Sequence, residues 1–408
     1  EKQLALKIIN NKNFSLVKEK AKDIISTGFT AGDGYGEIWI RDFNTFMELS
    51  LDVNDKDKIL EKLLIFFNFQ GTDGNIIDAY IPKEGMMQGT YEYIFSELEP
   101  NLAAHKNTVE TDQETSLIQA VYKYIQKTND RSLLQYQIDG RTVSERMDFA
   151  LEFLMNHRYN KEYGLITGGT TADWGDVQPE HKWGVFLTDD THYTLDIYDN
   201  AMLVIAMKNF IELVPESSAK WLPILEELET NIKKHLWDKD KMKFHPHIYL
   251  NGSPFPDDFN EDDIFYHGGT AVAIEAGLLS NEEIKISLKK MIDNVNKIGA
   301  ASIGLTMYPA YPDGTFKNKI MSVPYTYQNG GDWTWFGGRM IQQLVNYGFV
   351  NEAYEQILPM TERVIKNNGF YEWYTIKNEP RGSSSYRGSA GVLYKAIILL
   401  ETWAKEKE

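Results

Sequence analysis

Apolar residues recur along the chain at spacings of three and four residues, which is the period of an amphipathic helix. This pattern predicts twelve helices, at about residues 14–26, 38–53, 56–68, 109–127, 143–157, 191–213, 217–236, 267–277, 280–299, 331–346, 349–367 and 387–406. No Pro- or Ser-rich linker separates them, so we expect residues 1–408 to form a single domain.

The predicted helices alternate in character. Odd-numbered ones, such as those at 217–235 and 351–366, are charged on one side, whereas many even-numbered ones, such as 201–211 and 390–400, are apolar on most sides. A helix that is apolar on most sides is buried, and a one-sided helix lies outside it. The alternation therefore predicts an all-α fold, an (α/α)6 barrel of six helical hairpins. An irregular all-α protein is the alternative, while a helical solenoid needs a fixed sequence period, which the chain lacks.

Long segments rich in glycine, aromatic and acidic residues precede the predicted inner helices, at about 69–108, 158–190, 237–266, 300–330 and 368–386. Loops of this length in a compact domain are usually functional. Each leads into an inner helix from the same side, so we expect them to open on one end of the barrel.

Polar and aromatic side chains gather at or just before the start of all six predicted inner helices. They are Trp39, Arg41, Asp42, Asp112, Gln113, Asp173, Trp174, Asp176, Tyr266, His267, Gln328, Asn329, Asp332, Trp333, Trp335, Glu372, Trp373 and Arg387. Helix capping explains a single Asp at such a position, but it does not explain Trp and Arg gathered there. Polar groups that bind hydroxyls, beside aromatic rings that pack on sugar faces, indicate a carbohydrate substrate.

Composition narrows the other function classes. The net charge of −17 disfavours binding to nucleic acid, and no apolar run is long enough to span a membrane. The absence of cysteine excludes disulfides, thiolate metal sites and cysteine nucleophiles. The acidic stretch 257–263 lacks the Gly and the final Glu of an EF-hand, and His181 and His192 lack paired-ligand spacing, so we expect no metal and no other cofactor.

The sequence indicates no oligomeric state. The first residue is Glu1 and not Met. We therefore expect that an upstream piece such as a signal peptide has been removed, which favours a secreted or periplasmic location over the cytoplasm.

Glycoside hydrolysis needs two carboxyl groups, one protonated and one ionised, which stand about 6.5–9.5 Å apart in an inverting enzyme. The candidates are an acid at Asp173 or Asp176 and a base at Glu372, in segments before helices that face each other across a six-membered ring. Desolvation by Trp174 would raise the pKa of Asp176 and suit it as the acid. The alternative for Glu372 is a charged residue on a hairpin between aromatic residues.

Several of these segments resemble known enzymes. IWIRDF at 38–43 resembles the Trp-x-Arg-Asp segment with which glucoamylase-type enzymes hold the sugar at the cleaved end. Residues 371–394 are similar to the C-terminal segment of glucoamylases and of the processing α-glucosidase, trehalase and mannosylglycerate hydrolase group, where a Glu before an aromatic residue is the catalytic base. YQNGGDWTW at 327–335 resembles glycogen-debranching and disaccharide-phosphorylase relatives.

This resemblance implies that Glu372 is the base and that Arg41 and Asp42 are pocket residues. TADWGDV at 171–177 takes the place of the catalytic-acid loop, and the processing-glucosidase pattern favours Asp176, which follows the Trp, over Asp173. A glucoamylase-like pocket implies an exo-acting α-glucosidase.

Two other functions fit the same fold. A phosphorylase needs a cationic phosphate site, for which Arg381 and Arg387 are available, although Glu372 would repel phosphate. A sugar-binding or epimerising barrel is the second, and epimerases use pairs of histidines as acid and base. Only His267 stands at the start of a predicted inner helix.

Overall fold

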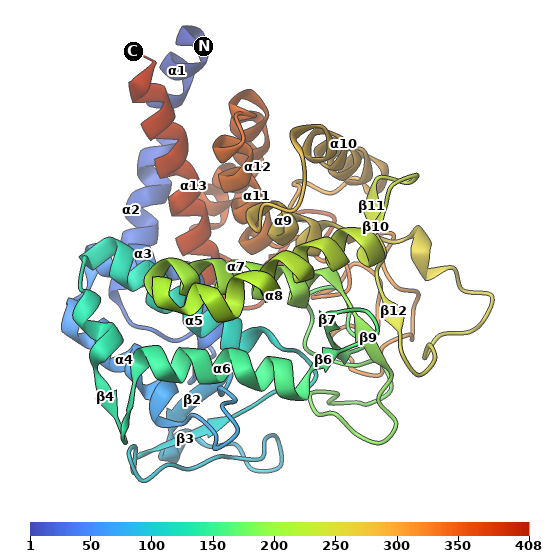
Figure 1. Ribbon diagram of the computed structural model, residues 1–408. Helices are drawn as coiled ribbons and strands as arrows, with labels where there is room; N and C mark the ends of the chain where they lie inside the picture. Colours follow the sequence, from blue (N-terminus) through green and yellow to red (C-terminus); the bar gives the residue numbers. More distant parts are fainter. Residues whose placement is uncertain (408) are drawn as a thin grey trace.

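The fold is a double ring of helices (Figure 1). The computed structural model describes residues 1–407. The inner helices are α3 (Ile40–Val53), α5 (Asp112–Thr128), α7 (Ile197–Leu213), α9 (His267–Glu275), α11 (Thr334–Asn346) and α13 (Arg387–Glu406). Each contacts the next, and α13 contacts α3, which closes the ring. The outer helices are α2 (Lys12–Ser26), α4 (Lys56–Asn68), α6 (Val143–His157), α8 (Ser218–Asn231), α10 (Asn281–Ile298) and α12 (Val350–Asn367).

All twelve predicted helices are present, and the predicted alternation of outer and inner helices is confirmed. The pattern did not predict α1 (Lys2–Ile9), a short helix that packs on α13 with Ala5 and Ile8 buried. Its eight residues are too few to display a clear helical period. Several inner helices also begin later than predicted. For example, α7 begins at Ile197 because the residues before it form a strand and the N-cap Asp196, which accepts a hydrogen bond from the Asp199 amide.

The long segments before the inner helices contain short antiparallel strands. The first sheet joins β1 (Ile38–Trp39), β2 (Ala79–Pro82) and β3 (Leu102–His105). The other strands are β4 (Gln137–Ile138), β5 (Arg141–Thr142), β6 (Tyr159–Asn160), β7 (Leu165–Ile166), β8 (Gly168–Gly169), β9 (Tyr193–Leu195), β10 (Trp237–Asp238), β11 (Lys243–Phe244), β12 (Ile248–Tyr249), β13 (Phe265–Tyr266), β14 (Met307–Tyr308), β15 (Trp373–Tyr374) and β16 (Pro380–Arg381). Short 3-10 or π turns cover Lys83–Gly85, Arg131–Gln135, Pro215–Ser217, Ile232–Leu236 and Glu261–Asp263.

The two rings differ at their helix N-termini. Four of the six outer helices carry a side-chain cap, from Asn11, Asp55, Thr142 and Ser280. Among the inner helices only α7 is capped by its own N-cap side chain, while α3, α5, α9, α11 and α13 are not. The amide groups and the positive dipole ends of most inner helices are therefore left to groups that approach from the loops.

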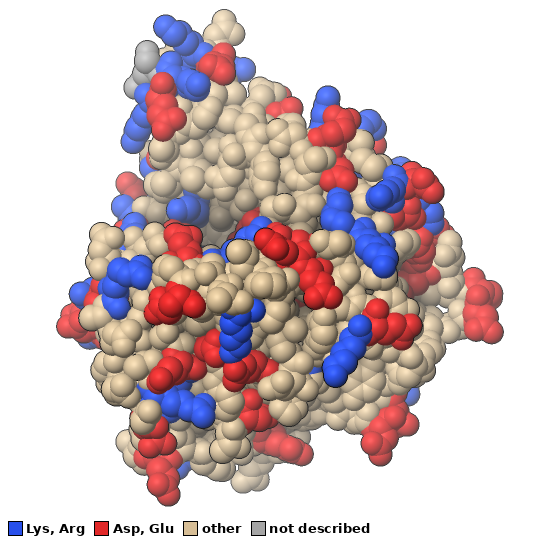
Figure 2. Space-filling view, in the orientation of Figure 1, with Lys and Arg blue, Asp and Glu red and all other residues tan. Residues whose placement is uncertain are grey.

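The surface shows no segregation of charge on the face seen in Figure 2, where acidic and basic side chains are interspersed. None of the helices within residues 1–407 combines the length and the hydropathy of a membrane span.

Candidate active site

A pocket with about 550 Å³ of space not filled by protein atoms opens at the N-terminal end of the inner helices. Its lining comes from the first turns of α3 and α5, from residues just before α11 and α13, and from the long loops. The lining residues are Ala31, Tyr35, Trp39, Ile40, Arg41, Asp42, Asp78, Glu110, Asp112, Gln113, Trp174, Asp176, Tyr327, Gln328, Trp333, Glu372 and Tyr386. This is the end of the barrel that the sequence predicts, and ten of the predicted site residues line it.

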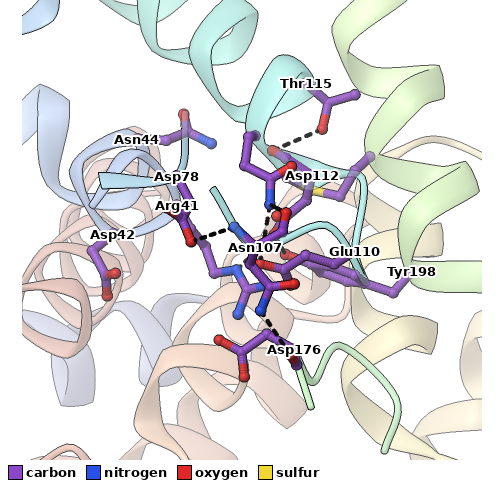
Figure 3. A network of polar contacts seen from close by, with 12 residues as sticks. Arg41, Asp42, Asn44, Asp78, Asn107, Glu110, Asp112, Thr115, Asp176 and Tyr198 are labelled. Atoms are coloured by element: carbon purple, nitrogen blue, oxygen red, sulfur yellow. Dashed lines mark hydrogen bonds and ion pairs between the residues drawn. The ribbon is translucent and has the colours of Figure 1, made fainter. Parts of the chain in front are cut away.

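Arg41 in the first turn of α3 is the centre of a buried polar network (Figure 3). Its Nε donates to Asp112 Oδ2 at 2.6 Å, and its guanidinium also pairs with Glu110. Tyr198 donates its hydroxyl to the same Asp112 oxygen at 2.7 Å. Burial opposes the charge of Arg41, but the carboxylate of Asp112 raises the pKa of the guanidinium well above its usual value. Arg41 is therefore a fixed cation whose charge is already matched by its two partners.

Asp176 lies in the loop before α7 and points its carboxyl group into the pocket. Gln328 Nε2 donates to Asp176 Oδ1 at 2.9 Å, and Asn107 Nδ2 donates to the backbone carbonyl of Asp176 at 2.7 Å. Burial raises the pKa of Asp176, although Arg41 and the Gln328 amide oppose the shift. A carboxyl group of this kind stays protonated to a higher pH than an exposed one.

Glu372 precedes β15 and is 4% exposed. The Tyr35 hydroxyl donates to Oε1 at 2.6 Å, and the Ser383 amide donates to Oε2 at 3.2 Å. Burial raises the pKa of Glu372, these two hydrogen bonds lower it, and the charge of Asp176 raises it again. The two carboxyl groups therefore interact electrostatically, which favours the state with one proton between them.

The turn that holds Glu372 requires glycine at residue 382. Gly382 has a φ of +71°, and a Cβ atom at this position would collide with the Glu372 carboxylate. Only glycine adopts this conformation without strain and also leaves room for the carboxylate.

Asp173, the other candidate acid, does not line the pocket. Both of its carboxyl oxygens accept from the Gly269 amide at 3.0 Å, so it caps α9 from a neighbouring loop. It is 2% exposed, and burial raises its pKa to about 8. Asp173 and Asp176 flank the same tryptophan, Trp174. The loop turns Asp173 toward the N-terminus of α9 and Asp176 toward the pocket.

Two further carboxyl groups border the pocket. Asp42 accepts a hydrogen bond from the Tyr386 hydroxyl, and burial raises its pKa to about 6. Asp78 pairs with His105 Nδ1 at 2.7 Å and accepts from the Asn107 amide at 3.0 Å. Sequence reasoning missed Asp78 because it lies just before β2 and not at the start of an inner helix.

Tyrosines are the other group that the sequence did not assign to the site. Tyr35, Tyr327 and Tyr386 line the pocket, and Tyr35 and Tyr386 each bind one of its carboxylates. Tyr327 and Tyr386 stand in the segments that carry the family resemblance, which is the signal that would have found them.

Two indole groups of the pocket wall are unpaired. Nε1 of Trp39 and Nε1 of Trp174 are buried and have no hydrogen-bond partner within residues 1–407. Buried donors are rarely left unsatisfied unless a ligand or water meets them. Together with the carboxylates, they offer both donors and acceptors to a polyhydroxylated ligand.

Three predicted binding residues have structural roles outside the pocket lining. Tyr266 shares a hydroxyl–hydroxyl hydrogen bond of 2.5 Å with Tyr311. His267 faces α10, where its Nε2 lies 3.1 Å from Asn294 Nδ2, and burial lowers its pKa to about 3. Arg387 donates to Thr30 and Thr27 and so anchors the loop before α3.

The segment around α11 supplies three of the other four, and the fourth, Trp373, belongs to β15. Asp332 forms a fully buried ion pair of 2.9 Å with Arg363, and Asn329 bonds the backbone of Tyr311 and Met321. Trp335 is buried against Trp174, with 5.4 Å between ring centroids. Trp373 lies beside Tyr327, at 6.4 Å, behind the pocket wall. The prediction that these residues face a ligand is not supported by their positions.

Ligand atoms of Asp238, His245 and Asp262 lie within 4.8 Å of one another on the surface. Asp262 is already bound by Lys241 at 2.5 Å and by His245 at 2.7 Å. The cluster is therefore explained by ion pairs between these side chains.

No family model matches the sequence, and no curated protein matches it significantly. Solved structures do match it along nearly its whole length. The GH63 mannosylglycerate hydrolase from Thermus thermophilus in complex with Tris superposes with a TM-score of 0.67, covering 95% of this chain and 100% of the other at 14% identity. Its complex with Tris and D-glycerate gives a TM-score of 0.65, covering 93% and 99% at 15% identity.

The rhamnosidase from Klebsiella oxytoca with rhamnose bound has a TM-score of 0.58 at 13% identity, covering 94% of this chain and 63% of the other. This chain has the six-hairpin (α/α)6 fold of these glycoside hydrolases. The predicted fold class is thereby confirmed, as is the structural resemblance to the mannosylglycerate hydrolase group.

Proposed function

We propose that this protein is an exo-acting, inverting glycoside hydrolase in which Asp176 is the general acid and Glu372 is the general base. The observation that carries the proposal is the meeting of these two carboxyl groups in one pocket. They come from segments before α7 and α13, which are opposite members of the inner ring. Burial raises the pKa of each, and the charge of Asp176 adds to the rise at Glu372.

Their different hydrogen bonds suit different roles. Glu372 receives two donors, Tyr35 and the Ser383 amide, which stabilise its ionised form. Asp176 receives one amide donor on Oδ1, and no side chain in the described part of the chain donates to Oδ2. Protonated Asp176 gives its proton to the glycosidic oxygen as the bond to the anomeric carbon breaks. Ionised Glu372 takes a proton from the water whose oxygen bonds to that carbon from the opposite face.

The sugar at the cleaved end would be bound by the polar lining of the pocket. The carboxylates of Asp42 and Asp112 accept from hydroxyl groups, and the unpaired Trp39 and Trp174 indoles donate to them. Trp333 supplies an apolar wall. This combination of a few placed polar groups and aromatic faces is what a monosaccharide requires.

The closed inner end of the pocket supports exo action. One turn beyond Arg41 on α3, Asn44 Nδ2 donates to Gln119 Oε1 at 3.1 Å, and Gln119 also bonds the backbone of Met202 on α7. These buried side chains fill the barrel interior, so a chain cannot continue through it. The glucoamylase-like segment makes an α-glucoside the first candidate substrate.

The two alternative functions receive less support. Arg381 is exposed and paired with Glu379, and Arg387 is occupied by Thr27 and Thr30, so neither supplies a phosphate site in the pocket. Among residues 1–407 no histidine lines the pocket, and His267 faces Asn294. A phosphorylase and a His-based epimerase would each need those groups at the site.

The test is a screen of nitrophenyl glycosides and oligosaccharides, with the first-formed product anomer followed by proton NMR. We expect hydrolysis that is independent of phosphate, with inversion at the anomeric carbon. Retention of configuration, or turnover only with phosphate, would contradict the proposal.

A further inference from the structure

We infer that the aglycone site beside Asp176 takes an uncharged sugar and excludes anionic aglycones. This inference rests on the proposed function, and it adds the chemical class of the leaving group. Its basis is the charge of the pocket together with an aromatic surface that continues from the pocket to the protein exterior.

Carboxyl groups outnumber cations in the pocket lining. The lining contains six carboxyl groups, from Asp42, Asp78, Glu110, Asp112, Asp176 and Glu372, and one guanidinium, from Arg41. Arg41 is already paired with Asp112 and Glu110, so these two carboxylates balance its charge. An anionic group that enters here meets more carboxyl groups than cations, and the one guanidinium already has carboxylate partners.

Asp78 places one of these charges next to the acid. Asn107 links the two segments, since its amide N–H binds Asp78 Oδ2 and its side chain binds the Asp176 carbonyl. The leaving oxygen lies at Asp176 by the proposed mechanism, so the aglycone lies within reach of Asp78. His105 pairs with Asp78 and is fully buried.

An aromatic surface begins at the same place. Trp39 in the pocket wall packs edge-on against His105 at 5.1 Å, and Tyr91 stacks on the His105 ring at 3.7 Å with an interplanar angle of 5°. Trp183 meets Tyr91 edge-on at 5.5 Å and is 42% exposed. The charges of Asp78 and Asp176 help to raise the pKa of Tyr91, after burial, which places the tyrosine near both carboxyl groups.

This surface suits a second sugar ring. Aromatic faces pack against the C–H faces of sugars, and the exposed Trp183 beside Tyr91 offers such a face. A small acid such as glycerate has little apolar surface for these faces, and its carboxylate would lose water beside Asp78. The structurally similar mannosylglycerate hydrolase has been solved with D-glycerate, so we expect the two proteins to differ in aglycone.

The test compares leaving groups on one glycone, which is first identified from a panel of nitrophenyl glycosides and glycosyl fluorides. Its disaccharide, its glycerol conjugate and its glycerate conjugate are then compared by kcat/KM. We expect the disaccharide to be best and the glycerate conjugate to be about 100-fold worse than the glycerol conjugate. A glycerate conjugate that is cleaved as well as the glycerol conjugate would overturn the inference. Failure to cleave any nitrophenyl glycoside or fluoride would instead overturn the proposed function.

Two variants assign the effect to residues. Asp78→Asn should narrow the difference between glycerol and glycerate conjugates by about tenfold, because it removes the repelling charge. Trp183→Ala should lower the ratio of disaccharide to fluoride kcat/KM by about tenfold, because the fluoride has no ring to stack. Tyr136→Ala, at a half-exposed aromatic outside the pocket lining, is the matched control and should leave both ratios unchanged. An unchanged ratio in both test variants contradicts the assignment.

Discussion

Opposite sides of the inner ring begin with similarly polar segments but use them differently. On one side, the first turns of α3 and α5 present Arg41, Asp42 and Asp112 to the pocket. On the other, His267 of α9 and Asp332 just before α11 are buried in contacts with outer helices. Both sets are polar residues at inner-helix N-termini, and only the first is available to a ligand.

The two sides differ in whether the outer helices carry polar side chains that can pair with these residues. Asn294 on α10 meets His267, and Arg363 on α12 meets Asp332. Behind α3 and α5, the buried face of α4 is apolar, with Ile59, Leu63 and Phe66. A polar side chain that finds no partner in the outer ring turns toward the pocket, because burial without a partner is costly.

The largest expected effect is at the pocket side. Glu372→Gln should lower kcat by roughly 10³-fold or more, since the amide cannot take a proton from water. The midpoint temperature of thermal unfolding of this variant should differ from that of the wild type by no more than a few degrees. Glu379→Gln, at an exposed position on the same hairpin, is the control and should keep full activity. Near-normal turnover of Glu372→Gln would remove this residue from the mechanism.

The next effect is on stability at the opposite side. Asp332→Ala leaves the fully buried Arg363 without its charge partner and should reduce the free energy of unfolding by about 3–5 kcal/mol. Urea denaturation measures this loss. Asp293→Asn, which breaks an exposed ion pair with Lys289, should cost no more than about 1 kcal/mol. If Asp332→Ala and Asp293→Asn are equally stable, the assignment of a structural role to Asp332 is wrong.

Asp173 gives a smaller effect that depends on pH. Burial raises its pKa to about 8 from 3.8, so the folded state holds a proton that the unfolded state releases above about pH 4. Its contribution to stability is therefore full at low pH and is lost as pH rises toward 8. In wild type, this proton makes the free energy of unfolding fall by up to about 1.4 kcal/mol per pH unit between pH 4 and 8, and Asp173→Asn should abolish this contribution. The activity of the variant should stay within tenfold of the wild-type activity. Identical pH dependence in wild type and variant would contradict the assignment.

The smallest effects are shifts of the pH–rate profile. Tyr35→Phe removes a hydrogen bond to ionised Glu372, so the pKa of Glu372 should rise and the acidic limb of kcat/KM should move up by about one unit. Gln328→Leu removes the donor to Asp176, so the basic limb should move up instead. Movement of the same limb in both variants would mean that acid and base have been assigned incorrectly.

The barrel was predictable because its helices follow simple patterns. Alternating one-sided and fully apolar helices are visible in the sequence, and the loops that precede the inner helices must share one end of the barrel. Arg41, Asp42 and Asp112 were predicted from their places at the start of inner helices, and all three line the pocket.

The division between ligand-facing and structural residues was not predictable from the sequence. Asp173 and Asp176 are separated by two residues, and their fates depend on a loop in which Asp173 has a φ of +55°. The ion pair of Asp332 could not be predicted, because its partner Arg363 lies 31 residues away on another helix. Asp78 and Tyr35 reach the pocket from loops that carry no helix signal.

The most direct test of the central claim is the dependence of Asp176→Asn on the leaving group. Two substrates with the same glycone are compared. The dinitrophenolate of a dinitrophenyl glycoside departs without protonation, whereas the sugar that leaves from a disaccharide must be protonated by an acid. If Asp176 is the general acid, the variant should lose roughly 10³-fold in kcat/KM on the disaccharide and less than about tenfold on the dinitrophenyl glycoside. Glu372→Gln should lose activity on both. Equal losses of Asp176→Asn on both substrates would contradict the claim that Asp176 protonates the leaving oxygen.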